Sequence, residues 1–185
     1  MRIGVQGAIG SFSEAAGKKW LSSQNHTADI DYLISAHNVL SALDNGSIDY
    51  GVIAISNNRG GIVLESIEAL AQYQCKIIDR LSLLVQQNLL VLPGTKLDDI
   101  REIHSHHQAL RQCRDYIYEY LSGAKLIEAE DTALSAERLQ TGLLPKTAAV
   151  IASRQCAELY GLSILQENVH DITRNETLFL VLQRP

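Results

Sequence analysis

The sequence predicts an α/β protein made of two lobes with largely parallel sheets. Apolar runs typical of buried strands alternate with segments whose apolar residues recur at helical spacing, and this alternation indicates βαβ units. The stretch 76–94 is long and apolar but has no helical pattern, so we expect it to cross from one sheet to another. The chain closes with a further strand-like run. We therefore expect a first lobe of about residues 1–75 and 166–185, and a second lobe of about 76–165.

Most of the predicted strands are short runs rich in apolar residues, as is typical of strands that are buried on both faces of a sheet. In chain order the runs are RIGVQ, YGVIAI, REIHS, AKLIEA, TAAVIA and TLFLVLQ.

A segment with helical periodicity follows each of the first five strands. In the first three segments the apolar residues that share a helical face are Phe12/Ala15/Ala16/Trp20, Val63/Ile67/Leu70/Ala71 and Leu110/Cys113/Ile117/Tyr120/Leu121. The fourth and fifth segments have the sequences EDTALSAERLQ and SRQCAELYG. Residues suited to helix starts support three of them. Ser11 with Glu14 three residues later forms a capping-box signature, Asp131 or Thr132 suits an N-cap, and Ser153 begins the last segment.

The composition is that of a globular protein, with 46% hydrophobic and 20% charged residues and a net charge of −5. Because there is no basic block, we expect no nucleic-acid partner. The most apolar stretch is interrupted by Gln86, Gln87 and Asn88, and the amino terminus lacks a signal-peptide pattern, so we expect no membrane association. Three cysteines without metal-binding spacing indicate reduced, buried thiols in a cytoplasmic protein.

The carboxyl ends of the predicted strands are rich in small and polar residues. These ends are QGAIGS, SNNRGG, HSHHQ, EDT and ASR, and each also opens a helix. Ligands of open α/β sheets bind beyond the carboxyl ends of strands, and helix starts favour anions. Polar turns are also common simply because turns are exposed, but the density of amides, hydroxyls and imidazoles across all five predicts a site for a small, carboxylate-bearing molecule.

The segment IHSHHQALRQ contains three histidines within four positions. It has neither an H-x-x-x-H spacing nor an evident carboxylate ligand, so we expect no metal site. We expect Ser105, His106 and Gln108 to be hydrogen-bonding groups at a helix start. Because imidazole titrates near neutral pH, a general-acid or anion-binding role for His106 stays open.

Five segments in order resemble the catalytic domain of prephenate dehydratases. VQGAIGSFSEAA is similar to the family's Gly-Pro-x-Gly-Thr/Ser-Tyr-Ser segment, and DYGVIAISNNRGGIV to its Asp-Tyr-x-Val-x-Pro-Ile-Glu-Asn-Ser/Thr-x-x-Gly-x-Val segment. SHHQALRQCR resembles its Ser-His-Pro-Gln-Ala-Leu-x-Gln-Cys segment, while YGLSIL and NETLFLVL resemble its Tyr-Gly-Leu and Asn-x-Thr-Arg-Phe segments. The resemblance extends through nearly the whole chain.

The resemblance implies a fold like the type II periplasmic binding proteins, with two lobes and a cleft between them. It implies that the substrate is prephenate, which loses its ring carboxylate as carbon dioxide and its ring hydroxyl as water to give phenylpyruvate. Neither a metal nor an organic cofactor is needed, since aromatisation drives the reaction. The family tends to form dimers, so the resemblance also implies a homodimer.

The resemblance assigns roles to individual residues. The family's catalytic threonine, asparagine and glutamine fall on Thr177, Asn57 and Gln108. We expect the substrate-binding residues to be Ser105, His106, Asn58, Thr132, Ser11 and Arg59.

Several motif positions differ from the family. The arginine after the threonine is Leu178, the glutamate before the asparagine is Ser56, and the residue after that asparagine is Asn58. Two motif prolines are replaced by Ala8 and His107. Loss of the guanidinium removes a bidentate, charge-assisted contact of about 1.5–3 kcal/mol.

A neighbouring arginine is a candidate replacement for that charge, and Arg59 and Arg174 lie close in sequence to matched motifs. The resemblance does not extend to the family's regulatory ACT domain, so we expect no feedback by phenylalanine through it.

Three activities therefore stay open. The first is dehydration of prephenate in aromatic amino-acid biosynthesis. The second is decarboxylation without aromatisation, because related prephenate decarboxylases lack the regulatory domain and some carry leucine at the position of Leu178. The third is a binding protein that kept the cleft without turnover.

Overall fold

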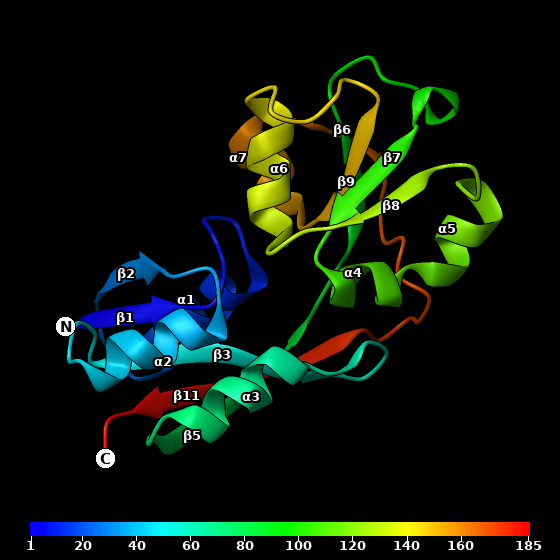
Figure 1. Ribbon diagram of the computed structural model, residues 1–185. Coiled ribbons are helices and arrows are strands. Elements are labelled where there is room, and N and C mark those ends of the chain that lie inside the picture. The colour runs from blue at the N-terminus through cyan, green and yellow to red at the C-terminus, as the bar shows by residue number, and fades with distance from the viewer. The chain divides into compact units, whose positions relative to one another are not determined.

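The computed structural model describes all 185 residues and divides into two compact units. Unit 1 comprises Met1–Ala8, Phe12–Leu84 and Glu176–Pro185, and unit 2 comprises Ile9–Ser11 and Val85–Asn175. Both units are α/β, with one sheet and its own helices in each (Figure 1).

Unit 1 is built on a mixed sheet with the strand order β2-β1-β3-β11-β5, in which β4 also pairs with β3. The strands are β1 (Arg2–Val5), β2 (Asp29–Tyr32), β3 (Tyr50–Asn57), β4 (Gly61–Ile62), β5 (Lys76–Leu84) and β11 (Glu176–Gln183). The helices are α1 (Phe12–Ser23), α2 (Ala36–Asp44) and α3 (Leu64–Gln72). Strand β11, drawn in red, thus lies between β3 and β5 although it is last in the chain (Figure 1).

The sheet of unit 1 is covered by helices on both faces. Trp20 and Leu21 of α1 are in one apolar cluster with Phe179 and Val181 of β11. Residues of α2 and α3 form a second cluster with alternate residues of the same strand, Leu180 and Leu182. Successive residues of a strand point to opposite faces, so the apolar run of β11 is buried from both sides.

Unit 2 has a second mixed sheet with the strand order β10-β6-β9-β7-β8. Its strands are β6 (Asn88–Val91), β7 (Glu102–Ser105), β8 (Lys125–Glu128), β9 (Ala148–Ala152) and β10 (Ser163–Gln166). Its helices are α4 (His107–Gln112), α5 (Arg114–Tyr120), α6 (Thr132–Gln140), α7 (Arg154–Tyr160) and the short 3₁₀ turn η1 (Leu97–Asp99). The central strand β9 is fully buried, in keeping with its composition of alanine, valine and isoleucine.

The sheets differ from expectation in one respect, because they are mixed rather than largely parallel. Four strand pairings are parallel and five are antiparallel. Four of the antiparallel pairings involve β6 or β11, and the fifth is β3 with β4, which a short turn connects.

The chain passes between the units later than expected from the sequence. Residues 76–84 stay in unit 1 because β5 pairs along its length with β11, and 166–175 stay in unit 2. The chain crosses between Leu84 and Val85 and returns between Asn175 and Glu176. The short segment Ile9–Ser11 also groups with unit 2.

Two further expectations concern cysteines and membranes. All three cysteines are free, with Cys113 and Cys156 buried and Cys75 half-buried. Burial raises the pKa of the Cys113 thiol far above its ordinary value, and the nearby Asp171 carboxylate adds to this, so the thiol stays protonated. None of the helices combines the length and the apolar character that crossing a bilayer requires.

Candidate active site

The side chains of Asn57 and Thr177 meet in the sheet of unit 1. The two residues are directly opposite each other in the antiparallel ladder between β3 and β11. Asn57 Nδ2 donates to Thr177 Oγ1 over 2.9 Å and to the Glu176 carbonyl over 3.0 Å. Both side chains are buried, with 5% of Asn57 and 7% of Thr177 exposed. Two of the three predicted catalytic residues are therefore in direct contact, although they are 120 positions apart in the chain.

The orientation of the Asn57 amide is determined by its other contacts. Asn57 Oδ1 accepts from the backbone N–H of Arg59 over 2.8 Å and of Gly60 over 2.7 Å. A flipped amide would point its NH₂ group at these two donors, so only one assignment satisfies the hydrogen bonds. Asn57 therefore presents a donor, and not an acceptor, to Thr177.

This orientation decides what the Thr177 hydroxyl can do. A hydroxyl has one proton to donate and lone pairs that accept. Because Thr177 Oγ1 accepts from Asn57, its own proton is left to be donated to another group. The arrangement is that of a hydrogen-bond donor or proton donor held in a buried setting.

Asn58 also connects the same two strands, next to Asn57 and Thr177. The backbone N–H of Asn58 donates to the Glu176 carbonyl over 3.0 Å, and the Glu176 N–H donates to Asn58 Oδ1 over 2.9 Å. The Asn58 side chain thus fixes the start of β11, next to Thr177. Asn57, Asn58, Arg59 and Thr177 therefore share one end of the sheet of unit 1.

The two motif positions at which this chain has a neutral residue in place of a charged one are opposite each other in the sheet. Leu178 pairs with Ser56 in the β11–β3 ladder, with Leu178 at the position of the family's arginine and Ser56 at that of its glutamate. Directly opposite residues of an antiparallel pair share a face, and Thr177 points to the other one. Both positions are neutral in this chain, so Leu178 faces no carboxylate across the ladder.

In unit 2, the residues of the histidine-rich segment lie where β7 ends and α4 begins. His106 is the N-cap of α4, and its Nδ1 accepts from the Gln108 N–H over 3.3 Å. Gln108 is buried, and the Ser105 hydroxyl donates to the Ile151 carbonyl over 2.6 Å. The rings of His106 and His107 lie 4.4 Å apart, so unit 2 offers two neighbouring imidazoles here.

Thr132 begins α6, but the residue that caps this helix is the one before it. Asp131 Oδ1 accepts from the Leu134 N–H over 2.8 Å, and the Ser135 hydroxyl donates to the Asp131 carbonyl. Of the two N-cap candidates, the structure therefore selects Asp131. The Thr132 hydroxyl is not part of this cap.

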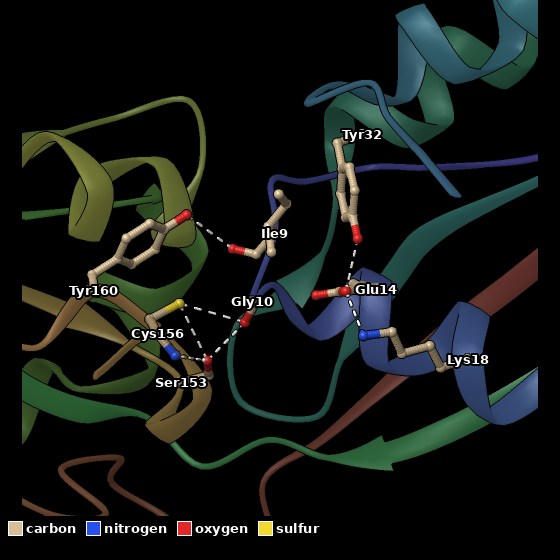
Figure 2. A network of polar contacts seen from close by, with 8 residues as sticks. All are labelled: Ile9, Gly10, Glu14, Lys18, Tyr32, Ser153, Cys156 and Tyr160. Atoms are coloured by element: carbon tan, nitrogen blue, oxygen red, sulfur yellow. Dashed lines mark hydrogen bonds and ion pairs between the residues drawn. The ribbon is translucent and has the colours of Figure 1, made fainter. Parts of the chain in front are cut away.

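Ser11 follows a segment that α7 holds in place (Figure 2). The Ser153 hydroxyl and the Cys156 thiol both donate to the Gly10 carbonyl, over 2.7 and 3.4 Å. Tyr160 donates to the Ile9 carbonyl over 3.3 Å. Gly10 has a φ of +90°, and a Cβ there would meet Cys156 Sγ at 3.0 Å, so the backbone and the neighbour both require glycine.

Glu14 is a buried carboxylate that the sequence pattern led us to regard as a helix-capping residue. Its Oε1 accepts from the Tyr32 hydroxyl over 2.8 Å and pairs with Lys18 Nζ at 2.6 Å (Figure 2). The Lys18 side chain is 54% exposed, so only the carboxylate of this pair is buried, and the lysine four residues after the glutamate is the sequence signal for the pair.

A second polar cluster, which sequence reasoning missed, lies in unit 2. Gln112 Oε1 accepts from Gln87 Nε2 and from Asn175 Nδ2. All three amides are buried. Gln112 is the second glutamine of SHHQALRQCR, and its place in a resembling motif was the available signal.

Comparison with known proteins agrees with the resemblance. The family model described as prephenate dehydratase matches residues 3–185. Arogenate dehydratase 5 of Arabidopsis thaliana is 34% identical over all of this chain and 42% of its own length. The prephenate dehydratase of Methanocaldococcus jannaschii is 33% identical over 94% of this chain and 61% of its own length. The chain thus spans about half the length of these curated relatives.

Solved structures agree on the fold. The prephenate dehydratase of Arthrobacter aurescens, solved with L-Phe, superposes on all of this chain and 61% of its own with a TM-score of 0.81 and 28% identity. A protein described as a novel type of quorum-quenching acylase superposes on all of this chain and 64% of its own with a TM-score of 0.74 and 30% identity.

A methionine-binding lipoprotein of Bacillus subtilis shares the fold at a TM-score of 0.56 and 10% identity, over all of this chain and 83% of its own. The predicted likeness to periplasmic binding proteins is thereby confirmed. The family match extends over nearly every residue, and the motif asparagine and threonine are in contact in the sheet of unit 1. The chain belongs to the prephenate dehydratase family.

Proposed function

We propose that this protein converts prephenate to phenylpyruvate, with Thr177 as the group that protonates the leaving hydroxyl. The observation that carries the proposal is the hydrogen bond from Asn57 Nδ2 to Thr177 Oγ1, which leaves the threonine proton to be donated. Membership of the prephenate dehydratase family supports the reaction type.

The reaction asks for little covalent chemistry from the protein. The electrons of the bond to the ring carboxylate move into the ring as carbon dioxide leaves, and the C–O bond of the ring hydroxyl breaks. The departing oxygen takes the Thr177 proton and leaves as water, and the threonine regains a proton from solvent. Since aromatisation drives these steps, the protein has mainly to orient the dicarboxylate and supply that proton.

We further propose that Gln108 acts with Thr177 and Asn57 in catalysis, and that polar groups near strand ends bind the substrate. These groups are Ser105, His106, Asn58, Thr132, Ser11 and Arg59. In support, Ser105, His106 and Gln108 lie at the junction of β7 and α4, and Asn58 and Arg59 follow Asn57 directly. The Ser105 hydroxyl donates its proton to the Ile151 carbonyl, so toward the substrate it would accept from the ring hydroxyl rather than bind a carboxylate, which has no proton to donate.

One observation favours a second activity, decarboxylation without loss of the hydroxyl. Leu178 replaces the family's arginine, as in some prephenate decarboxylases. However, Leu178 and Thr177 are successive residues of β11 and point to opposite faces, and Leu178 is opposite Ser56 rather than Asn57. The contact between Asn57 and Thr177 is intact, so we favour the dehydratase.

Incubating the purified protein with prephenate, and separately with arogenate, tests this proposal. We expect phenylpyruvate and carbon dioxide from prephenate, identified by mass and ultraviolet spectrum. A dihydro product that keeps its hydroxyl would replace the proposal with the decarboxylase. Binding of prephenate without conversion would show that the protein binds carboxylates and does not catalyse this reaction. Phenylalanine from arogenate would identify the amino analogue as a substrate.

We also propose that the protein acts as a homodimer in the cytoplasm. The three free thiols support a reducing compartment. The proposal of a dimer is based on the family's tendency to form dimers, and a measurement of the molar mass in solution tests it.

A further inference from the structure

The buried amide side chains of Gln87, Gln112 and Asn175 form a hydrogen-bonded group in unit 2, which we call the amide cluster. Gln112 Oε1 accepts from Gln87 Nε2 over 3.1 Å and from Asn175 Nδ2 over 2.8 Å. The exposed fractions are 2% for Gln87, 4% for Gln112 and 1% for Asn175. Buried side chains in contact with each other are restricted to few conformations, so the position of each depends on the others.

The backbone around the cluster is fastened to the same elements. Val85 N–H donates to the Asn175 carbonyl over 2.7 Å, and Val169 N–H donates to the Gln87 carbonyl over 2.8 Å. Asp171 N–H donates to the Gln112 carbonyl over 2.8 Å. The segment that leads into β11 is therefore held along its length by residues before β6 and at the end of α4.

The cluster connects covalently to the proposed catalytic group. Asn175 precedes Glu176, whose carbonyl accepts from Asn57 Nδ2, and Thr177 follows. Asn175 is thus bonded directly to the first residue of β11, which the Asn58 side chain also holds. A shift of this strand start would move the Thr177 hydroxyl, and proton transfer is sensitive to displacements of about 1 Å.

Gln87 is poorly explained by stability alone. Its Oε1 is buried and has no hydrogen-bond donor within reach. A buried acceptor without a donor destabilises the folded state, and it offsets what the long bond to Gln112 contributes. An apolar side chain of similar length would avoid this cost, while Gln112 Oε1 would still be satisfied by Asn175.

We propose that Gln87 is a positioning residue for the dehydration step, acting on Thr177 through Gln112 and Asn175. The proposal rests on the proposed function, because it assumes that Thr177 is the proton donor. A locally unfavourable residue in a cluster that is bonded to the strand of a reactive group is the pattern expected of a functional constraint. Gln87 would then act in the step that breaks the C–O bond, and not in substrate affinity.

The test is Gln87→Met, compared with the wild-type protein and with Gln86→Met. Gln86 is the neighbouring glutamine and its side chain is exposed, so this variant makes the same chemical change away from the cluster. We expect Gln87→Met to lower kcat on prephenate about tenfold or more, with KM within about twofold. We expect its midpoint of thermal unfolding to stay within about 2 °C of the wild type or to rise. Gln86→Met should match the wild type in all three quantities.

Two results would overturn the positioning role. One is full kcat in Gln87→Met. The other is a fall in kcat accompanied by a clear fall in the unfolding midpoint, because Gln87 would then be a structural residue. If the wild-type protein itself does not convert prephenate, the proposed function fails and this inference fails with it. If the wild type is active and Gln87→Met is equally active, only this inference fails.

Discussion

Thr177→Val will lower kcat for the conversion of prephenate to phenylpyruvate by about two to four orders of magnitude. Valine has nearly the same shape as threonine but no proton to donate, so the substrate still binds and KM should change little. The unfolding free energy should fall by about 1 kcal/mol, because Asn57 Nδ2 loses one of its two acceptors but keeps the Glu176 carbonyl. Steady-state kinetics and thermal unfolding measure both quantities.

Thr177→Ser is the matched control for that variant. Serine keeps the hydroxyl and can accept from Asn57 in the same way, so its kcat should remain within about tenfold of the wild type. Undiminished turnover by Thr177→Val would remove Thr177 from the proton transfer.

Asn57→Asp should be nearly as damaging to catalysis, by reversing one hydrogen bond. The new carboxylate still accepts from the Arg59 and Gly60 N–H groups, so the turn after β3 is kept. It has no donor to offer Thr177, and the threonine proton then turns toward the carboxylate. We expect kcat to fall by about two orders of magnitude or more.

An exposed asparagine provides the control for this second variant. Asn25→Asp makes the same chemical change on the surface and should leave kcat unaltered. Asn57→Ala differs from both, because it leaves two backbone N–H groups without their acceptor. It should lower the unfolding free energy by about 2–4 kcal/mol. An Asn57→Asp protein with wild-type kcat would show that the direction of this hydrogen bond is irrelevant.

Much of the fold was predictable because the strands of this chain are strongly apolar. Runs such as YGVIAI and TAAVIA correspond to β3 and β9, and the terminal run TLFLVLQ forms most of β11. The alternation with helical stripes identified the α/β class for the same reason. The identity of the site followed from motif order, since residues far apart in a chain have no local signal of contact.

The elements that were missed have weaker patterns. β2 reads DIDY and is only partly buried, so it lacks the solid apolar run of its neighbours. α2 has the helical spacing Val39, Leu40, Leu43 behind the N-cap Ser35, a signal that was present but was not used. The stripe from 107 to 121 is two helices, because Cys113 leaves the helical conformation between α4 and α5.

Pairing across the sheet is what no sequence pattern could supply. The opposition of Ser56 and Leu178 depends on a register shift between Leu178 and Phe179, which only the ladder reveals. The burial of Gln87 likewise could not be inferred from the sequence pattern. Its neighbours Gln86 and Asn88 marked the stretch as polar, whereas the side chains of Gln87 and Asn88 are buried in unit 2 and that of Gln86 is exposed.

A double-mutant cycle between Asn57 and Thr177 tests the central claim most directly, namely that the Asn57 amide acts by orienting the Thr177 hydroxyl. It compares kcat of the wild type, Asn57→Asp, Thr177→Val and the double variant. If the two residues act as one unit, the double variant will lose no more than the more damaging single variant. If the two losses multiply in the double variant, the residues act independently and the claim is contradicted.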